Sequence, residues 1–224
     1  MKAELDRSEW VRGSCAALCR IEHVGRYLLL LNRNRRRKGL YTLSPIGGAL
    51  QLDDPTALEA LGVRFEDPDA RELRFMLPMS QLDAFRAWFH RGEGRERSPW
   101  RELYEELVEE SRLLAALQPE DVRITPLRVE EDEGYTERQG QTGLFTHYFF
   151  EIYDVKFLRA ATLGPLLAAP AESGAVWVTE EQLRTGRPLR LHFDGAERLV
   201  QVKGQVLLPP HDRKSSGTPP AGEK

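Results

Sequence analysis

Three glutamates in the middle of the chain have the spacing that gathers carboxylates on one side of a helix. Glu102 is followed by Glu105 and Glu106, so the three side chains project from the same helical edge. Like charges this close repel one another, and a divalent cation removes the repulsion. Mg²⁺ and Mn²⁺ prefer oxygen ligands and commonly bridge carboxylates to substrate phosphates. The three residues are therefore candidate metal ligands, with a solvated acidic helix face as the alternative.

The apolar residues around these glutamates predict the helix that carries them. Leu103, Leu107 and Leu114 fall on one arc of a helical wheel, and the glutamates fall on the opposite side. Ser98 precedes this pattern and is a candidate N-cap. We therefore expect a helix over residues 100–117.

A longer pattern extends from this helix toward the N-terminus. Arg101-Glu102-Leu103 and Glu105-Glu106 are preceded by Gly92-Glu93, with seven residues between Glu93 and Arg101. This arrangement resembles the Nudix box: Gly, five residues, Glu, seven residues, Arg-Glu, an apolar residue, any residue, Glu-Glu, any residue, Gly and an apolar residue. Gly47-Gly48 resembles the glycine turn that enters the box. The segments 143–155 and 172–183 resemble the strands and the helix that follow it.

The match departs from the box in two places. Gly48 and Glu93 are separated by 44 residues where the box has five, which predicts an insertion at about 53–92. Val108 stands where the box has its closing glycine, so the helix is expected to run on. A box split in this way resembles the SMODS-associated Nudix group, bacterial domains encoded beside second-messenger nucleotide synthetases. Members of that group are thought to sense or process nucleotides in antiphage systems.

The resemblance implies an α/β fold, a Nudix-like α/β/α sandwich with a mixed curved sheet and an inserted strand–helix segment within the box. It also implies a hydrolase that cleaves nucleoside diphosphate-linked compounds by Mg²⁺- or Mn²⁺-assisted attack of water. The first alternative is a catalytically weak nucleotide-sensing module, partnered with a nucleotide synthetase or an effector. The second is an interaction domain that keeps a fossil box. The retained charges argue against the fossil, whereas the insertion and the lost glycine favour the sensor over the enzyme.

The box also implies a role for each charged residue. The expected metal ligands are Glu102, Glu105 and Glu106. Glu102 is a metal ligand or the general base, and Arg101 is the second expected catalytic residue. Glu93 and Arg101 are expected to form a structural ion pair that holds the loop. The backbone of Gly47 or Gly48 would contribute to the binding site. A further carboxylate could come from the following loop, and the sequence does not choose among Glu130, Glu131 and Glu133.

Two other groups of residues suggest ligand binding. The basic run at 33–38 could grip phosphates, and the alternative is a solvated hairpin loop. The candidate residues in this run are Arg35, Arg36 and Arg37. Trp88 and Phe89 could stack on a base, although helix-packing aromatic residues are usually core.

The remaining chain predicts one domain and a tail. The strands expected from apolar patterning are 14–22, 26–32, 72–77, 122–129, 146–155 and 199–208. A helix at 81–90, with Ser80 as candidate N-cap, and a helix at 180–183 after Thr179 are also expected. A polar loop is expected at 130–143. We predict a single domain over residues 1–211 and a disordered tail over 212–224.

Composition excludes several classes of protein. The chain has 224 residues and a net charge of −3, which argues against a protein that coats nucleic acid or reads a DNA sequence. No apolar run is long enough to cross a membrane, and residues 1–10 lack the apolar stretch of a secretory signal. Cys15 and Cys19 lie too far apart along one predicted strand for an easy disulfide. A reduced, cytoplasmic protein is therefore expected.

Overall fold

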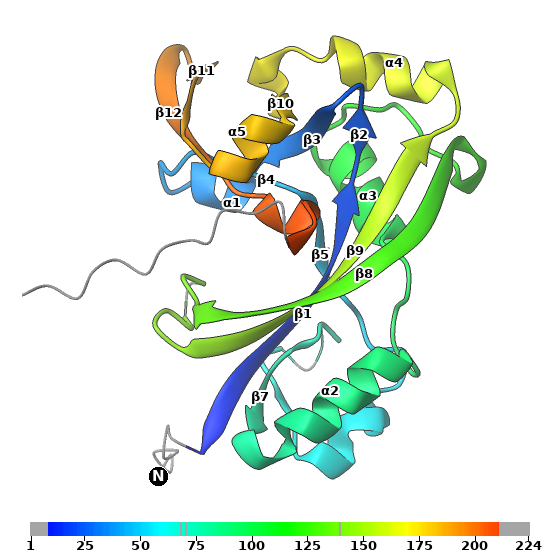
Figure 1. Cartoon of the computed structure of the whole chain (residues 1–224), viewed down its shortest axis with the longest axis vertical. Helices are drawn as coiled ribbons and strands as arrows, with labels where there is room; N and C mark the ends of the chain where they lie inside the picture. The colour runs from blue at the N-terminus through cyan, green and yellow to red at the C-terminus, as the bar shows by residue number, and fades with distance from the viewer. Residues whose placement is uncertain (1–8, 68, 70, 139, 211–224) are drawn as a thin grey trace, which may run out of the picture.

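The chain folds around two mixed β-sheets (Figure 1). The computed structural model describes residues 9–67, 69, 71–138 and 140–210, so the tail predicted at 212–224 lies outside the described residues. One sheet has the strand order β6 (Arg64–Phe65), β7 (Arg74–Pro78), β1 (Trp10–Arg20), β9 (Phe145–Phe157) and β8 (Val122–Tyr135), with β5 (Ile46–Ala49) also paired to β1. The other has the order β10 (Ala175–Thr179), β3 (Arg26–Leu31), β4 (Thr42–Ser44), β12 (Ala196–Val202) and β11 (Leu189–Phe193), with β2 (Glu22–His23) paired to β3.

Helices cover these sheets. The α-helices are α1 (Arg33–Arg36), α2 (Leu82–Arg91), α3 (Trp100–Tyr104), α4 (Ala160–Ala168) and α5 (Glu180–Thr185). A π-helical segment, η3 (Glu105–Glu110), continues α3. The short 3₁₀ turns are η1 (Pro55–Leu61), η2 (Met79–Gln81), η4 (Pro119–Asp121), η5 (Ala171–Ser173) and η6 (Gln205–Leu207). The expected mixed α/β fold with a strand–helix insertion is confirmed, and none of the described helices is long and apolar enough to cross a membrane.

Strand β1 organises the chain around the insertion. One edge of β1 pairs in parallel with β9. Its other edge is shared, because β7 pairs with residues 10–14 and β5 pairs with residues 16–19, both antiparallel. The insertion therefore leaves after β5 and returns a strand to the same edge of β1. The base of the insertion is closed by backbone pairing, in which Glu96 N donates to Gln51 O at 2.8 Å.

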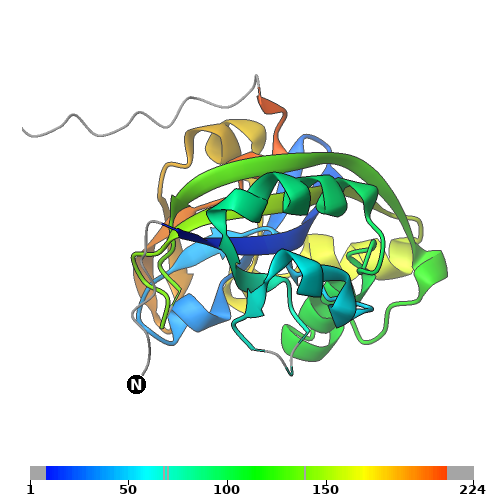
Figure 2. The same ribbon diagram turned by 90° about the horizontal axis from the view of Figure 1, so that it is seen from below.

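The aromatic residues of the insertion belong to the core. Phe85 and Phe89 on α2 pack on Phe149 of β9, each with ring centroids 5.2 Å apart, and Trp88 is also buried. Figure 2 shows α2 lying across β1, β8 and β9. The base-stacking alternative for Trp88 and Phe89 is therefore wrong. Helix α2 follows the turn η2 directly and begins at Leu82, so Ser80 is not its N-cap.

The box helix is shorter than its periodicity predicts. It ends at Glu110 rather than at residue 117. Ser111 N still makes the π-helical bond to Glu106 O at 3.0 Å, but the next residue, Arg112, has a left-handed φ of 54°, which breaks the helix. Leu114 is nevertheless buried in the same cluster as Leu103. The apolar pattern therefore predicts the burial of Leu114 correctly, whereas the helix predicted beyond Glu110 is wrong.

Three further segments test the patterning. Strand β8 continues to Tyr135, which corrects the loop expected from residue 130, since its partner β9 extends as far. The strand predicted at 199–208 overlaps β12, which ends at Val202, and its partner β11 was not predicted. Thr179 caps α5 as expected, with a reciprocal bond to Gln182.

Cys15 and Cys19 are free, buried thiols, and burial raises the pKa of both well above the ordinary value.

Candidate functional site

A cleft of about 750 Å³ lies between the box helix, the glycine strand β5 and the basic helix α1. One wall is acidic and carries Glu102, Glu105, Glu106, Glu109 and Glu110. The facing residues are basic and come from three separate segments: Arg33, Arg36 and Arg37 from α1 and its C-terminal end, Arg74 from β7, and Arg138 from the segment between β8 and β9. The cleft therefore brings together residues that are far apart in the sequence.

The acidic wall is positioned by the leucines on the opposite side of the box helix. Leu103 and Leu107 are fully buried in the core, so the intervening glutamates face the cleft. Ser98 Oγ accepts a hydrogen bond from Trp100 N at 3.2 Å, but the N-cap position of α3 is Pro99, so the N-cap predicted at Ser98 lies one residue too early. The sequence prediction that Glu102, Glu105 and Glu106 share one edge of a helix agrees with this geometry.

The glycine strand lies directly against these glutamates despite the insertion. Gly47 N donates a hydrogen bond to Glu106 Oε1 at 3.4 Å. A Cβ on Gly48 would overlap the carboxylate of Glu102, so only glycine leaves room for that side chain. The two halves of the split box are therefore reunited in space, and Gly47 and Gly48 both line the cleft.

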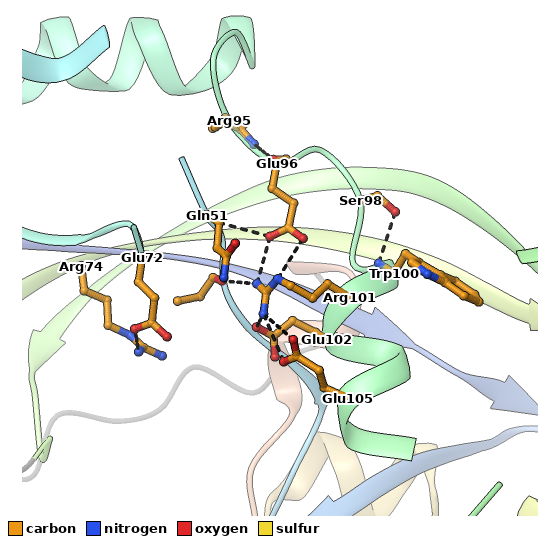
Figure 3. Close-up of polar contacts among 11 residues, drawn as sticks. Gln51, Glu72, Arg74, Arg95, Glu96, Ser98, Trp100, Arg101, Glu102 and Glu105 are labelled. Atoms are coloured by element: carbon orange, nitrogen blue, oxygen red, sulfur yellow. Dashed lines mark hydrogen bonds and ion pairs between the residues drawn. The ribbon is translucent and has the colours of Figure 1, made fainter. Parts of the chain in front are cut away.

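Arg101 is held in a network of carboxylates (Figure 3). Its guanidinium contacts Glu96 Oε2 at 3.0 Å, Glu102 Oε1 at 2.8 Å and Glu105 Oε2 at 3.2 Å. It also donates to the carbonyl of Ala49 at 2.8 Å. The upstream partner of Arg101 is thus Glu96, whereas the predicted partner Glu93 is exposed. The Glu93–Arg101 pair was wrong because the backbone pairing of Glu96 with Gln51 places residue 96 beside Arg101.

Burial raises the pKa of two glutamates in the acidic wall. Desolvation raises the pKa of Glu106 to about 8, and the neighbouring charges of Glu102, Glu110 and Glu105 act in the same direction against the opposing bond from Gly47. The pKa of Glu102 is also raised by desolvation, although Arg101 opposes the shift. Removing water from clustered carboxylates is costly unless a cation compensates their charge.

The basic run forms the short helix α1 rather than a hairpin loop. Asn32 caps it by accepting a hydrogen bond from Arg35 N at 3.0 Å. Arg36 and Arg37 both line the cleft, and the guanidinium of Arg36 also pairs with Asp194. Arg35 instead pairs with Glu137 at 2.6 Å. Arg33 lines the cleft and reaches Glu110 at 3.4 Å, which joins the two walls.

A protein family model matches most of the chain, including the residues that form this cleft. The model of the SMODS-associated NUDIX domain family matches residues 10–194. The chain belongs to the SMODS-associated NUDIX domain family. Among curated proteins, no relative matches it. The split box and the reunited glycine strand are thus features of a Nudix domain.

The additional carboxylate expected for this Nudix site does not come from the predicted residues. Glu131 pairs with Arg86 at 2.8 Å on α2, and Glu133 pairs with His147 at 3.0 Å. Glu130 is bonded to Arg128. The three glutamates lie on β8, and none of them is among the residues that line the cleft. The further carboxylates among the residues that line the cleft are Glu72, Glu109 and Glu110.

The residues of the cleft suit Mg²⁺ or Mn²⁺ by donor type. The acidic wall offers carboxylate oxygens, which these hard cations prefer, and burial raises the pKa of Glu106 against the opposing hydrogen bond from Gly47. Within the described part of the chain, no three His, Cys, Asp or Glu side chains already converge as a ligand set. Arg101 bridges Glu102 and Glu105, so these carboxylates would have to turn from Arg101 toward a cation.

Proposed function

We propose that the protein is a Nudix hydrolase that cleaves nucleoside diphosphate-linked compounds in the cleft between the box helix and α1. The observation that carries the proposal is the placement of an acidic and a basic wall around one cleft. A diphosphate needs both cations and arginines to compensate its charge. The proposed metal ligands are Glu102, Glu105 and Glu106, and the cofactor is Mg²⁺ or Mn²⁺.

The chemistry divides between the two walls. A bound divalent cation would compensate the phosphate charge and favour attack by water. Arg37, together with Arg36, which would have to turn from its pair with Asp194, would orient the phosphates from the opposite side. Glu102, whose pKa is raised, is the proposed general base and would take the proton of the attacking water at a carboxylate oxygen. Gly48 leaves space for this carboxylate, because a Cβ at that position would overlap it.

One observation favours a second candidate, a nucleotide sensor that binds without turnover. Arg101 neutralises Glu102 and Glu105 at 2.8 and 3.2 Å. A protein that keeps this arrangement when nucleotide is bound would not assemble the metal site. A second-messenger nucleotide synthetase or its effector is the proposed partner system in that case.

Hydrolysis separates the two candidates. We expect wild-type protein to cleave at least one member of a panel of dinucleoside polyphosphates and nucleotide sugars with Mg²⁺ or Mn²⁺. Replacing a base such as Glu102 by glutamine should lower turnover by about 10²–10⁴-fold, and Glu105→Gln should also lower it. Glu59→Gln is the matched control, because Glu59 is exposed on the insertion. Absence of turnover in wild type, or unchanged turnover in Glu105→Gln, would contradict the enzyme, and tight binding without turnover supports the sensor.

A further inference from the structure

Two arginines of the cleft come neither from the Nudix box nor from the basic run at 33–38. Arg74 lies on β7 of the insertion, and Arg138 lies between β8 and β9. Both line the same cleft as the acidic wall. Figure 3 shows Arg74 beside the Arg101 cluster, on the side of Gln51 and Glu72. An uninterrupted box would have no equivalent of Arg74, because that residue lies within the insertion.

The guanidinium groups around Arg74 and Arg138 outnumber the carboxylates that pair with them. Arg74 pairs with Glu72. Arg138 pairs with Glu66 at 3.3 Å, and the same carboxylate pairs with Arg12 at 2.6 Å. Three guanidinium groups therefore share two carboxylates, which leaves one excess positive charge. Arg12 and Glu66 are only 2% and 9% exposed, so the support beneath Arg138 is a built part of the fold.

The excess charge is partly desolvated. Burial lowers the pKa of Arg74, and the nearby positive charge of Arg138 acts in the same direction, against the opposing effects of Glu72 and Glu66. Guanidinium groups that repel one another in a partly buried site gain from a bound anion. Phosphate is the anion whose oxygens match the planar donors of arginine.

The segment that carries Arg138 is fixed on both sides of the cleft. The preceding residue, Glu137, pairs with Arg35 of α1 at 2.6 Å and lies 3.8 Å from Lys203 Nζ. Arg138 itself reaches the insertion through Glu66. The segment thus connects the basic helix to the insertion, and Arg138 is held at the cleft between them.

We propose that Arg74 and Arg138 form a second anion subsite, which binds a phosphate group of the substrate separate from the diphosphate. The proposal rests on the proposed function and narrows its substrate class to nucleoside diphosphate-linked compounds with an additional phosphate monoester. The diphosphate lies between the acidic wall and α1, and the additional phosphate lies against the insertion. The insertion and the β8–β9 connection therefore determine this part of the substrate specificity together.

Matched ligand pairs test this subsite by binding, in metal-free buffer where turnover does not enter the measurement. The probes are NADP⁺ against NAD⁺ and coenzyme A against 3′-dephospho-coenzyme A, since the members of each pair differ by one phosphate. Calorimetric titration should show about tenfold tighter binding of the phosphorylated member in at least one pair. In the double variant Arg74→Gln/Arg138→Gln this preference should disappear, while binding of the unphosphorylated member changes little.

Controls separate the subsite from general charge and from folding. Arg123→Gln/Arg190→Gln removes the same charge from exposed residues outside the cleft and should keep the preference. If the double variant does not fold, the same titrations are made with the single variant Arg138→Gln. Equal binding within both pairs by wild type, binding of none of the probes, or a preference that survives in the folded Arg74/Arg138 variants would overturn the subsite. A phosphate preference without metal-dependent turnover would instead contradict the proposed hydrolase and leave the subsite supported.

Discussion

At the scale of single residues, the two glycines of the entering strand have different neighbours. A Cβ on Gly48 would meet the carboxylate end of Glu102, which is flexible, whereas a Cβ on Gly47 would meet the backbone carbonyl of Ala17. Gly47 also has φ at 142°, a conformation that other residues rarely adopt. One glycine therefore leaves room for a side chain of the site, and the other is required by the backbone.

This difference predicts separable effects of two alanine substitutions. Gly48→Ala should displace Glu102, lowering turnover by about tenfold or more, with little change in thermal stability. Gly47→Ala should destabilise the fold by roughly 2–3 kcal/mol, because a backbone clash adds to an unfavourable φ. Thermal unfolding and steady-state hydrolysis of both variants provide the measurement. Equal losses of stability in the two variants would contradict the assignment.

The acidity of Glu106 predicts a pH dependence for the metal-free protein. The pKa is about 8 in the fold, above the ordinary value of 4.5, so the folded state holds a proton that the unfolded state releases. Stability should therefore fall as pH rises from about 4.5 to 8 and level off above 8, by on the order of 3–5 kcal/mol in total.

Glu106→Gln should remove this part of the pH dependence, because glutamine does not titrate. Denaturant unfolding at pH 5.5 and pH 8 measures the difference in the free energy of unfolding. The exposed control Glu59→Gln should retain the wild-type slope. A slope that is the same in Glu106→Gln and in wild type would show that another group causes it.

The residues of the acidic wall could be predicted from sequence, but their partners could not. Spacing alone placed Glu102, Glu105 and Glu106 on one helical edge. Glu96 was missed because its position depends on backbone pairing with Gln51 across the insertion. Arg74 and Arg138 carry no local pattern that points to a ligand, and they reach the cleft only through sheet pairing and the β8–β9 connection.

At the scale of elements, the insertion is attached to the sheet by a buried ion pair. Arg95 Nη2 contacts Glu151 Oε1 on β9 at 2.6 Å, and the two side chains are 2% and 14% exposed. Arg95 also lies 4.1 Å from the centre of the Phe89 ring. Glu151 accepts a further bond from Tyr153 at 2.7 Å. The contacts of Arg95 therefore connect three parts of the fold: the end of α2, the segment that leads from α2 back to the box, and β9.

Removal of Arg95 should therefore be costly. Arg95→Ala leaves Glu151 buried without its cation and should destabilise the protein by about 3–5 kcal/mol. Arg190→Ala is the control, since Arg190 and Glu197 form a largely exposed pair whose contribution is expected to be below about 1 kcal/mol. Urea unfolding of both variants measures the two changes. A loss below about 1 kcal/mol for Arg95→Ala would contradict the role of the buried pair.

Helix α1 predicts a distinction between neighbouring basic residues. Arg37 lines the cleft, whereas Lys38 is exposed outside it. Arg37→Gln should weaken binding of ADP by about tenfold, because it removes a charge-assisted contact to phosphate. Lys38→Gln should have little effect. Equal affinities of the Arg37 variant and wild type, measured by calorimetry, would remove α1 from the binding site.

The elements themselves were predictable where local pattern and burial agree. Strands β3 and β9 are rich in apolar and aromatic residues, and Thr179 with Gln182 forms a capping box. The end of the box helix was not predictable from periodicity, because Leu114 is buried after a turn at Ser111 and Arg112 rather than by continued helix. Tertiary packing thus reproduces a helical burial pattern without a helix.

At the scale of the whole molecule, the overall net charge of −3 conceals a separation of charge across the cleft. The acidic wall comes from one helical segment, whereas the basic residues come from α1, the insertion and the β8–β9 connection. Arg33 and Glu110 join the two sides at 3.4 Å and are both about half exposed. A polyphosphate with a divalent cation would compensate both walls at once.

The most direct measurement of this account is Mn²⁺ binding in the presence of ADP, followed by the electron paramagnetic resonance signal of free Mn²⁺. We predict at least one bound Mn²⁺ per chain in wild type, about tenfold weaker binding in Glu106→Gln, and wild-type binding in Glu59→Gln. The account is contradicted if wild type binds no Mn²⁺ with ADP at saturating concentration, or if Glu106→Gln binds it as tightly as wild type.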